Sequence, residues 1–318
     1  MNNSFAKFSG NWFFGEGIML IVTLLWGATF VIVKESINDI STMLFIAIRF
    51  SIAIIILFPI LFKVRKEFTK EAFTAGLIIG FLLFGGFAAQ TVGLKYTTAT
   101  KSGFLTGSAV VMVPFLQIII AKRKPTLGAI IGVIFVFTGI LLLSSDTNSI
   151  FSIFVEFKEN FTIGDFLTLI CALFFALYII YIDKFTKLHH FWVLVIMQMG
   201  VTALLAFVFL FVGSYSGIEN VRIEFTNYLL FGLFYTSIFA TLVTTVLQTK
   251  YQKLISPTKA GIIFSLEPVF AAVFAFFLLN EKITNLGYVG AALIFAGLII
   301  SELFDTLFIK NGYANSKS

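Results

Sequence analysis

Charged side chains are scarce in this sequence: Asp, Glu, Lys and Arg make up 12% of its 318 residues, whereas 59% are hydrophobic. So few charges cannot cover a water-soluble surface, so a soluble globular protein is excluded. A membrane-spanning helix needs about 20 apolar residues. Ten runs of this kind predict an all-α integral membrane protein, and they are residues 17–36, 43–62, 72–94, 101–121, 126–144, 164–183, 191–213, 227–249, 257–279 and 284–303.

Cysteine and histidine are almost absent, which removes most catalytic and metal sites. The single cysteine, Cys171, excludes an intramolecular disulfide and is interpreted as a small packing residue. The two histidines, His189 and His190, are adjacent and would point to different faces of a helix. The motifs HExxH, GxSxG and GxxxxGK[ST] are also missing. We therefore expect no enzyme, no metal and no cofactor, and any pumping would use an ion gradient or the gradient of the solute itself.

The positive charges that remain are unevenly distributed, although the chain has a net charge of +6. If the N-terminus is cytoplasmic, fifteen of the 22 Lys and Arg residues fall in cytoplasmic segments. Because positively charged loops stay in the cytoplasm, we predict a multi-pass protein of the cell inner membrane with both termini cytoplasmic. Anionic lipid headgroups account for the basic character, so we expect the lipid bilayer and no nucleic acid as a partner.

The chain contains an internal repeat. Shifting residues 100–139 forward by 158 positions aligns Lys101 with Lys259, Gly132 with Gly290 and Gly139 with Gly297. A shift of 149 aligns Gly15-Glu16 with Gly164-Asp165. The sequence thus predicts two repeats of five helices each, in residues 1–144 and 164–304, with a non-cytoplasmic connecting loop at 145–163 and a cytoplasmic tail at 305–318.

An odd number of helices in each repeat has a mechanical consequence. The second repeat must enter the membrane from the opposite side, so the two halves are inverted copies. Inverted repeats are a recurrent design of secondary transporters, in which the halves exchange conformations around a site near the middle of the membrane. The predicted architecture therefore favours alternating access, although channels with inverted repeats are an alternative.

Several segments also resemble the drug/metabolite transporter superfamily, EamA type. They are LLWGATFVIVK in the first span, IAIRF in the second, SLEPVFAAVFAFFLLNEKIT across the ninth and LGYVGAALIFAGLII after it. The resemblance covers essentially the whole chain. It implies a ten-helix transporter with cytoplasmic termini, of a kind that commonly exports amino acids or related metabolites.

Glu267 and Pro268 are the most unusual pair of residues in the spans. An ionised carboxylate at the middle of a membrane costs about 2.5–3.5 kcal/mol, so Glu267 is expected to face the bundle interior. Pro268 lacks an amide hydrogen and would open the helix at the carbonyl of Phe264. We predict a role in gating or coupling, with proton binding, contact with a substrate amine and a purely structural role as alternatives. The first repeat has Ala109 and Val110 at the matching positions, so this role belongs to one half.

Arg49 is the strong cation placed clearly inside a span. Three interpretations are open: its side chain extends to the membrane surface, it lines the substrate path, or it pairs with Glu267 in one conformation. Lys34 and Lys101 lie nearer the ends of their spans, and we expect both to be solvated.

The remaining candidates are neutral polar or aromatic residues within the spans, which offer hydrogen bonds without a full charge. Each of them is also a candidate for a hydrogen bond between helices. The predicted substrate path includes Trp26, Thr29, Gln90, Thr106, Tyr178, Gln198, Tyr235, Ser237, Thr241 and Ser265, together with Arg49.

These observations predict a secondary active transporter that exports amino acids or similar small metabolites by alternating access, with protons as a candidate coupling ion. One alternative is an uncoupled carrier or an exchanger for another solute class, such as nucleobases or drugs. A more distant alternative is a membrane receptor or structural protein. Both a monomer and a homodimer are compatible with the sequence.

Overall fold

The computed structural model describes residues 3–143, 161–279 and 284–315. Within these ranges the regular elements are helices, and one isolated antiparallel bridge joins Ile40 to Ile223. Eight helices are long and apolar enough to cross a membrane, and the shorter apolar helices Leu127–Leu143 and Asn285–Ser301 complete the predicted set of ten. The all-helical membrane fold is therefore confirmed.

The first repeat contains three continuous spans and two interrupted ones. Its elements are α1 (Asn3–Gly27) with α2 (Thr29–Ser36), α3 (Thr42–Val64) with the short η1 (Arg65–Glu67), α4 (Lys70–Gly93), α5 (Ala99–Gly107) with α6 (Ala109–Ala121), and α7 (Leu127–Leu143). Helix α1 begins well before the apolar run predicted at 17–36, because polar residues continue the helix beyond the span.

The second repeat also has five spans, but its first span is continuous and its third contains a π-helical turn. Its elements are α9 (Ile163–Phe185), α10 (Phe191–Tyr215), α11 (Asn227–Ser237) with the π-helical η2 (Ile238–Val243), α12 (Thr244–Tyr251) and η3 (Gln252–Leu254), α13 (Pro257–Phe264) with α14 (Glu267–Leu279), and α15 (Asn285–Asn315). Most of the predicted connecting loop 145–163 lies outside the described residues. Helix α15 continues to Asn315, into the segment predicted as a tail.

Side-chain caps determine where several helices begin. The hydroxyls of Thr98 and Ser256 accept hydrogen bonds from the amides of Lys101 and Lys259. Thr162 caps α9 in the same way, in a capping box with Asp165. A cap of this kind satisfies an amide that the first turn of a helix leaves unpaired. Thr98 and Ser256 are 158 positions apart, so the capped start of the fourth helix occurs in both repeats.

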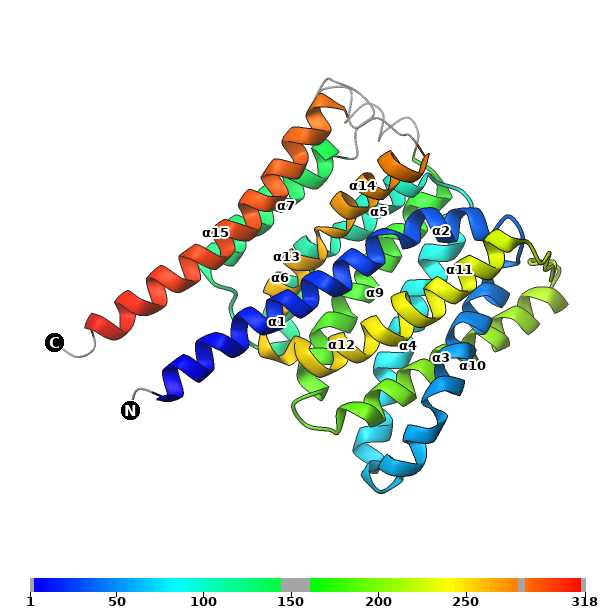
Figure 1. The fold of residues 1–318 in the computed structure, drawn as a ribbon, viewed down its shortest axis with the longest axis horizontal. Coiled ribbons are helices and arrows are strands. Elements are labelled where there is room, and N and C mark those ends of the chain that lie inside the picture. The colour runs from blue at the N-terminus through cyan, green and yellow to red at the C-terminus, as the bar shows by residue number, and fades with distance from the viewer. Residues whose placement is uncertain (1–2, 144–160, 280–283, 316–318) are drawn as a thin grey trace.

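Helices α7 and α15 lie side by side in an antiparallel pair at one edge of the bundle (Figure 1). A Cβ atom added to Gly132 would lie 2.7 Å from the carbonyl oxygen of Gly297, and one added to Gly139 would lie 2.6 Å from that of Gly290. These glycines therefore let two helix backbones touch. In the repeat alignment, Gly132 matches Gly290 and Gly139 matches Gly297. Exchanging the two repeats therefore converts the first contact into the second, as expected of inverted repeats around a two-fold axis.

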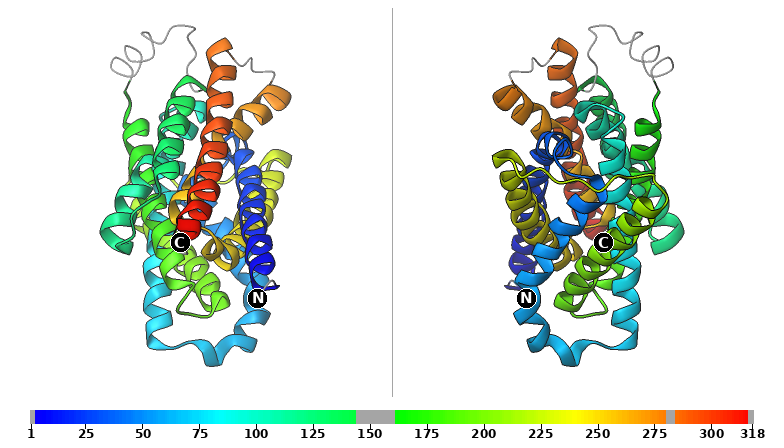
Figure 2. Two further views of the ribbon diagram at one scale, coloured as in Figure 1. Left: turned by 90° about the vertical axis from the view of Figure 1, so that its left-hand side faces the viewer. Right: turned by 90° about the vertical axis from the view of Figure 1, so that its right-hand side faces the viewer.

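The two chain termini lie at the same end of the helices, as both further views also show (Figure 2). We call this end the terminal face and the other end the opposite face. Buried side chains of α3, α4, α9 and α10 form one apolar core, which includes Phe50, Ile79, Leu194 and Met199. A second apolar core joins α1, α6, α9 and α13. Helices of both repeats contribute to each core, so the two halves form one bundle.

Candidate functional site

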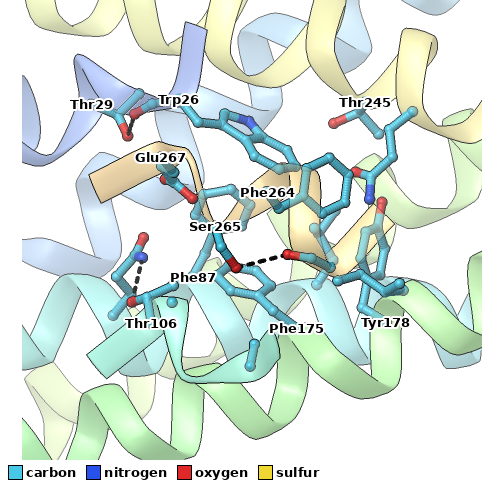
Figure 3. Close-up of a pocket in the computed structure, with 17 residues that line it drawn as sticks. Trp26, Thr29, Phe87, Thr106, Phe175, Tyr178, Thr245, Phe264, Ser265 and Glu267 are labelled. Carbon is cyan, nitrogen blue, oxygen red and sulfur yellow. Dashed lines mark hydrogen bonds between the residues drawn. The ribbon is translucent and has the colours of Figure 1, made fainter. Parts of the chain in front are cut away.

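A cavity lies between the two repeats, with about 750 Å³ of empty space including its open mouth. Its walls come from α1, α2, α4, α5 and α6 of the first repeat and from α9, α12, α13 and α14 of the second (Figure 3). Seven of the residues singled out in the sequence line it: Trp26, Thr29, Gln90, Thr106, Tyr178, Ser265 and Glu267. Their contact with a solute stays a prediction.

Two interrupted helices meet at this cavity. The first is broken at Ser108, between α5 and α6, and the second at Ser265 and Leu266, between α13 and α14. A Cβ atom on Gly107 would lie 3.4 Å from the ring of Pro268, so the two breaks pack against each other. Discontinuous helices near the middle of the membrane are typical of transporter binding sites, because the interrupted backbone is tolerated where it lines a cavity.

The helix breaks at Phe264, where the sequence predicts it, but Pro268 alone does not explain the break. The chain leaves the helix before the proline, and Pro268 occupies the second position of α14. A missing amide hydrogen costs little in the first turn of a helix. The first repeat is interrupted at the matching place with Ala109 and Val110 there. Pro268 is therefore compatible with the break but is not its sole cause.

Glu267 is the first residue of α14 and is partly buried in the cavity wall. Its carboxylate makes no hydrogen bond or ion pair with the part of the chain that the structure describes. The close-up places it near Trp26 and Thr29 of the first repeat (Figure 3). A carboxyl group that lines a cavity in this way is available to bind a cation or to exchange a proton with the cavity.

Arg49 is not the partner of Glu267 in this structure. The Arg49 side chain is buried, its Nη2 donates to the carbonyl oxygen of Ala240 at 3.1 Å, and its Nε donates to Thr241. The guanidinium also lies over the ring of Phe87, 4.6 Å from the centroid. Of the three interpretations, extension to the membrane surface is wrong because the side chain is anchored inside the bundle.

The π-helical turn η2 explains why Ala240 can accept this bond. A π-helical turn shifts the helical hydrogen-bond pattern and makes a carbonyl available to side chains. The indole nitrogen of Trp26 donates to Ala240 at 3.2 Å and to the Thr244 hydroxyl at the same distance. The turn therefore ties one wall of the cavity to the buried Arg49.

Several predicted path residues link helices through hydrogen bonds. The Tyr178 hydroxyl donates to Gln198 at 2.6 Å, and Gln198 in turn donates to Thr249 at 2.9 Å. Tyr235 donates to the carbonyl oxygen of Leu25 at 2.9 Å. Ser237 is buried at the end of α11. The predicted residues that do not line the cavity are Arg49, Gln198, Tyr235, Ser237, Thr241 and Pro268.

Sequence reasoning missed the aromatic and aliphatic part of the lining, including Phe87, Phe175 and Phe264. Forty-two phenylalanines are distributed through the chain, and composition alone does not separate those that face lipid from those that face a cavity. Thr245 and Gln248 on α12 were also missed. Their spacing with Thr241 and Thr244 forms a polar stripe at helical periodicity, and that signal would have found them.

The chain is similar to known membrane transporters along most of its length. The model of the EamA-like transporter family matches it twice, at residues 13–145 and 162–303. A protein of Archaeoglobus fulgidus named "Uncharacterized transporter" is 33% identical over 285 residues, which is 90% of this chain and 84% of that protein. The "Uncharacterized transporter YoaV" of Bacillus subtilis is 27% identical over 299 residues, 89% of this chain and 94% of its own.

A solved crystal structure superposes on this chain with a TM-score of 0.71 and 14% sequence identity, covering 91% of this chain and 98% of that one. This likeness concerns the fold. Two matches to the family model, one for each five-helix half, agree with the two-fold relation between α7 and α15 and with the central cavity. The chain therefore belongs to the EamA-like transporter family.

Proposed function

We propose that this protein is a secondary active transporter that exports amino acids or similar small metabolites by alternating access. The observation that carries the proposal is a cavity shared by two inverted repeats, at the place where a broken helix of each repeat meets the other. We propose export rather than uptake because the sequence resembles the drug/metabolite transporter superfamily, whose members commonly export such solutes. We further propose an inner-membrane location with cytoplasmic termini, on the distribution of Lys and Arg.

The electrostatics of the cavity support a solute that carries both charges. Helix α6 begins at Ala109 with no side chain that neutralises the positive partial charge of its amino end. The matching helix α14 begins with the carboxylate of Glu267. A zwitterion would place its ammonium group near Glu267 and its carboxylate near the start of α6. Aromatic walls, including Phe87, Phe175 and Phe264, would hold the apolar part of the solute.

Glu267 also supports proton coupling. If a proton and the solute's ammonium group compete for the same carboxylate, binding one releases the other, and a proton gradient can drive the solute outward. An uncoupled carrier would use the same cavity without this exchange. The two mechanisms differ in whether flux depends on an imposed pH gradient.

The first test uses purified protein in liposomes loaded with a panel of labelled amino acids, nucleobases and organic cations. We expect gradient-driven flux of at least one amino acid, accelerated by an opposing proton gradient. Flux confined to nucleobases or to organic cations would contradict the substrate class, and flux insensitive to the pH gradient would contradict the coupling. Absence of flux across the whole panel would contradict transport of these solutes.

The second test substitutes the carboxylate. Glu267→Gln should weaken binding of a zwitterionic solute by about tenfold or more, since it removes a charge-assisted contact, and should remove the pH dependence of flux. The comparison variant is Ala109→Glu, which places the same acid in the other repeat and should repel the solute's carboxylate. Binding is measured by thermal stabilisation with solute. If Glu267→Gln retains both affinity and pH dependence, Glu267 has neither role.

A further inference from the structure

Three ion pairs connect the repeats in the part of the chain that the structure describes: Lys95 with Glu219 at 3.6 Å, and two pairs that involve the fourth span of each repeat. Lys101, in the first turn of α5, lies 2.8 Å from Asp165 at the start of α9. Lys259, in the first turn of α13, lies 3.5 Å from Glu16 in α1. Each of these last two pairs joins the first span of one repeat to the fourth span of the other. The solvated state expected for Lys101 from the sequence is therefore wrong, because its ammonium group is held by a buried carboxylate.

The two pairs are equivalent under exchange of the repeats. Lys101 aligns with Lys259, and Glu16 aligns with Asp165. Exchanging the two repeats therefore converts the Lys101–Asp165 pair into the Lys259–Glu16 pair. The glycine contacts between α7 and α15 are related in the same way. The chain has thus kept the same inter-repeat ion pair in both halves.

The lysines occupy positions that helix physics disfavours. Each stands at the third residue of a helix whose cap is Thr98 or Ser256. The amino end of a helix carries a positive partial charge, which repels a cation and favours an anion. The paired carboxylate offsets this repulsion, so each lysine is best accommodated while its ion pair is formed. Separating the two charges would leave the lysine at the positively charged amino end of its helix without a compensating anion.

The pairs lie at opposite ends of the cavity. Helices α5 and α9 begin at the opposite face, whereas the apolar part of α1 and the start of α13 lie toward the terminal face (Figure 1). All four helices contribute residues to the cavity or pack against those that do. Separating either pair would therefore move two walls of the cavity apart at one face of the membrane.

The two ends differ in how tightly they are closed. Asp165 is fully buried and accepts further hydrogen bonds from the Thr97 hydroxyl at 2.5 Å and the Thr162 amide at 2.8 Å. Beside it, a Cβ atom on Gly164 would lie 2.6 Å from the backbone oxygen of Gly93. At the equivalent Gly15 the nearest atom is the Leu254 side chain, at 2.9 Å.

A groove between α1, α13 and α15 reaches the Lys259–Glu16 pair. This groove, with about 800 Å³ of space including open solvent, is lined by Glu16 and Lys259 together with apolar residues of α1, α13 and α15. The longer ion pair and the side-chain contact at Gly15 indicate that the looser closure is at the terminal face.

We propose that these two ion pairs stabilise alternately the closed states of the two faces, with Lys101–Asp165 formed when the opposite face is closed and Lys259–Glu16 formed when the terminal face is closed. Both pairs are formed in this structure, so both faces are closed, the terminal face less tightly than the opposite face. This inference relies on the proposed alternating access, but it concerns which residues set the balance between the two states.

The experiment measures access to the cavity from each side without any solute. Cys171→Ala removes the native thiol, and Gln90→Cys places a single thiol in the cavity wall. A membrane-impermeant maleimide is added to right-side-out or inside-out vesicles, and the ratio of the two labelling rates is measured. The matched variants are Lys101→Gln and Lys259→Gln, which make the same chemical change at equivalent positions.

We expect Lys101→Gln to shift the labelling ratio about tenfold toward the opposite face and Lys259→Gln to shift it toward the terminal face, which is the size of a typical coupling between states. The double variant Lys101→Glu with Asp165→Lys should restore the ratio if the attraction between the charges matters. Shifts in the same direction, or no shift in two variants that elute as folded monodisperse protein, would overturn the proposal. Because the labelling needs no substrate, these outcomes are independent of whether flux is found.

Discussion

Arg49 shows at the scale of one residue how a full charge is accommodated inside this membrane protein. Its guanidinium has two oxygen acceptors, at Ala240 and Thr241, and an aromatic face at Phe87. These contacts come from η2 and α4, two elements far apart in the sequence. The charge is therefore part of the packing that holds the two repeats together.

The variant Arg49→Lys keeps the charge and loses the planar fork that reaches both acceptors at once. We expect it to lower the free energy of unfolding by about 1.5–3 kcal/mol, the usual contribution of a hydrogen bond to a charged group. The measurement is the melting temperature in detergent. Arg65→Lys makes the same change at an exposed position of η1 and is the control. Equal melting temperatures for the two variants would show that the fork of Arg49 contributes nothing.

Residue type alone identifies only part of the candidate site. Glu267 was identified because a carboxylate in a span needs a special environment. Gln198 and Tyr178 have the same chemistry as cavity residues, and only the helix packing shows that Gln198 joins Tyr178 to Thr249 while Tyr178 lies along the cavity. The sequence carries no information on the rotation of each helix about its axis, which decides between these two outcomes.

At the scale of elements, the crossing of α7 and α15 depends on the absence of side chains. The backbone of one helix occupies the space where the other would have a Cβ atom, so there is no flexible group that can move aside. Close packing of this kind resists even one added methyl group.

We therefore expect Gly139→Ala to destabilise the protein by about 1–3 kcal/mol, the usual cost of overpacking. The control is Gly200→Ala in α10, where an added Cβ would meet nothing within 4 Å. There the same change should be neutral or stabilising by about 0.5–1 kcal/mol, because alanine restricts the unfolded chain. Melting temperatures of the two variants test the difference. A lower melting temperature for Gly200→Ala than for Gly139→Ala would contradict this account of the crossing.

The boundaries of the spans were predictable, whereas their interruptions were not. Apolar length fixes where a helix crosses the membrane, and the ten predicted runs correspond to the observed spans. The first repeat is broken at Ser108, although the positions that match Glu267 and Pro268 hold neither proline nor glycine. This break depends on tertiary packing against the partner repeat, including the contact of Gly107 with Pro268.

At the scale of the whole molecule, the two chain ends share one face of the bundle (Figure 2). This arrangement follows from ten spans, since an even number returns the chain to the side where it began. The uneven distribution of Lys and Arg then predicts that this face is cytoplasmic.

The orientation can be tested by fusing a reporter to each end of the full chain in separate proteins. We expect a fluorescent protein that folds in the cytoplasm to be active at both ends, and a phosphatase that requires export to be inactive at both. A phosphatase inserted between α3 and α4, at the segment that contains η1, should also be inactive. Activity of the phosphatase at either terminus would contradict the predicted orientation, and different results at the two termini would contradict the ten-span count.

The crossing of α7 and α15 has a consequence for how such a chain arises. Gly132 contacts Gly297 as Gly290 contacts Gly139, so the interface is isologous in the sense used for dimers with two-fold symmetry. A single five-helix unit could make the same contact with a second copy of itself inserted upside down in the membrane. These four glycines thus form, within one polypeptide, the kind of interface that two antiparallel copies of one five-helix unit would share.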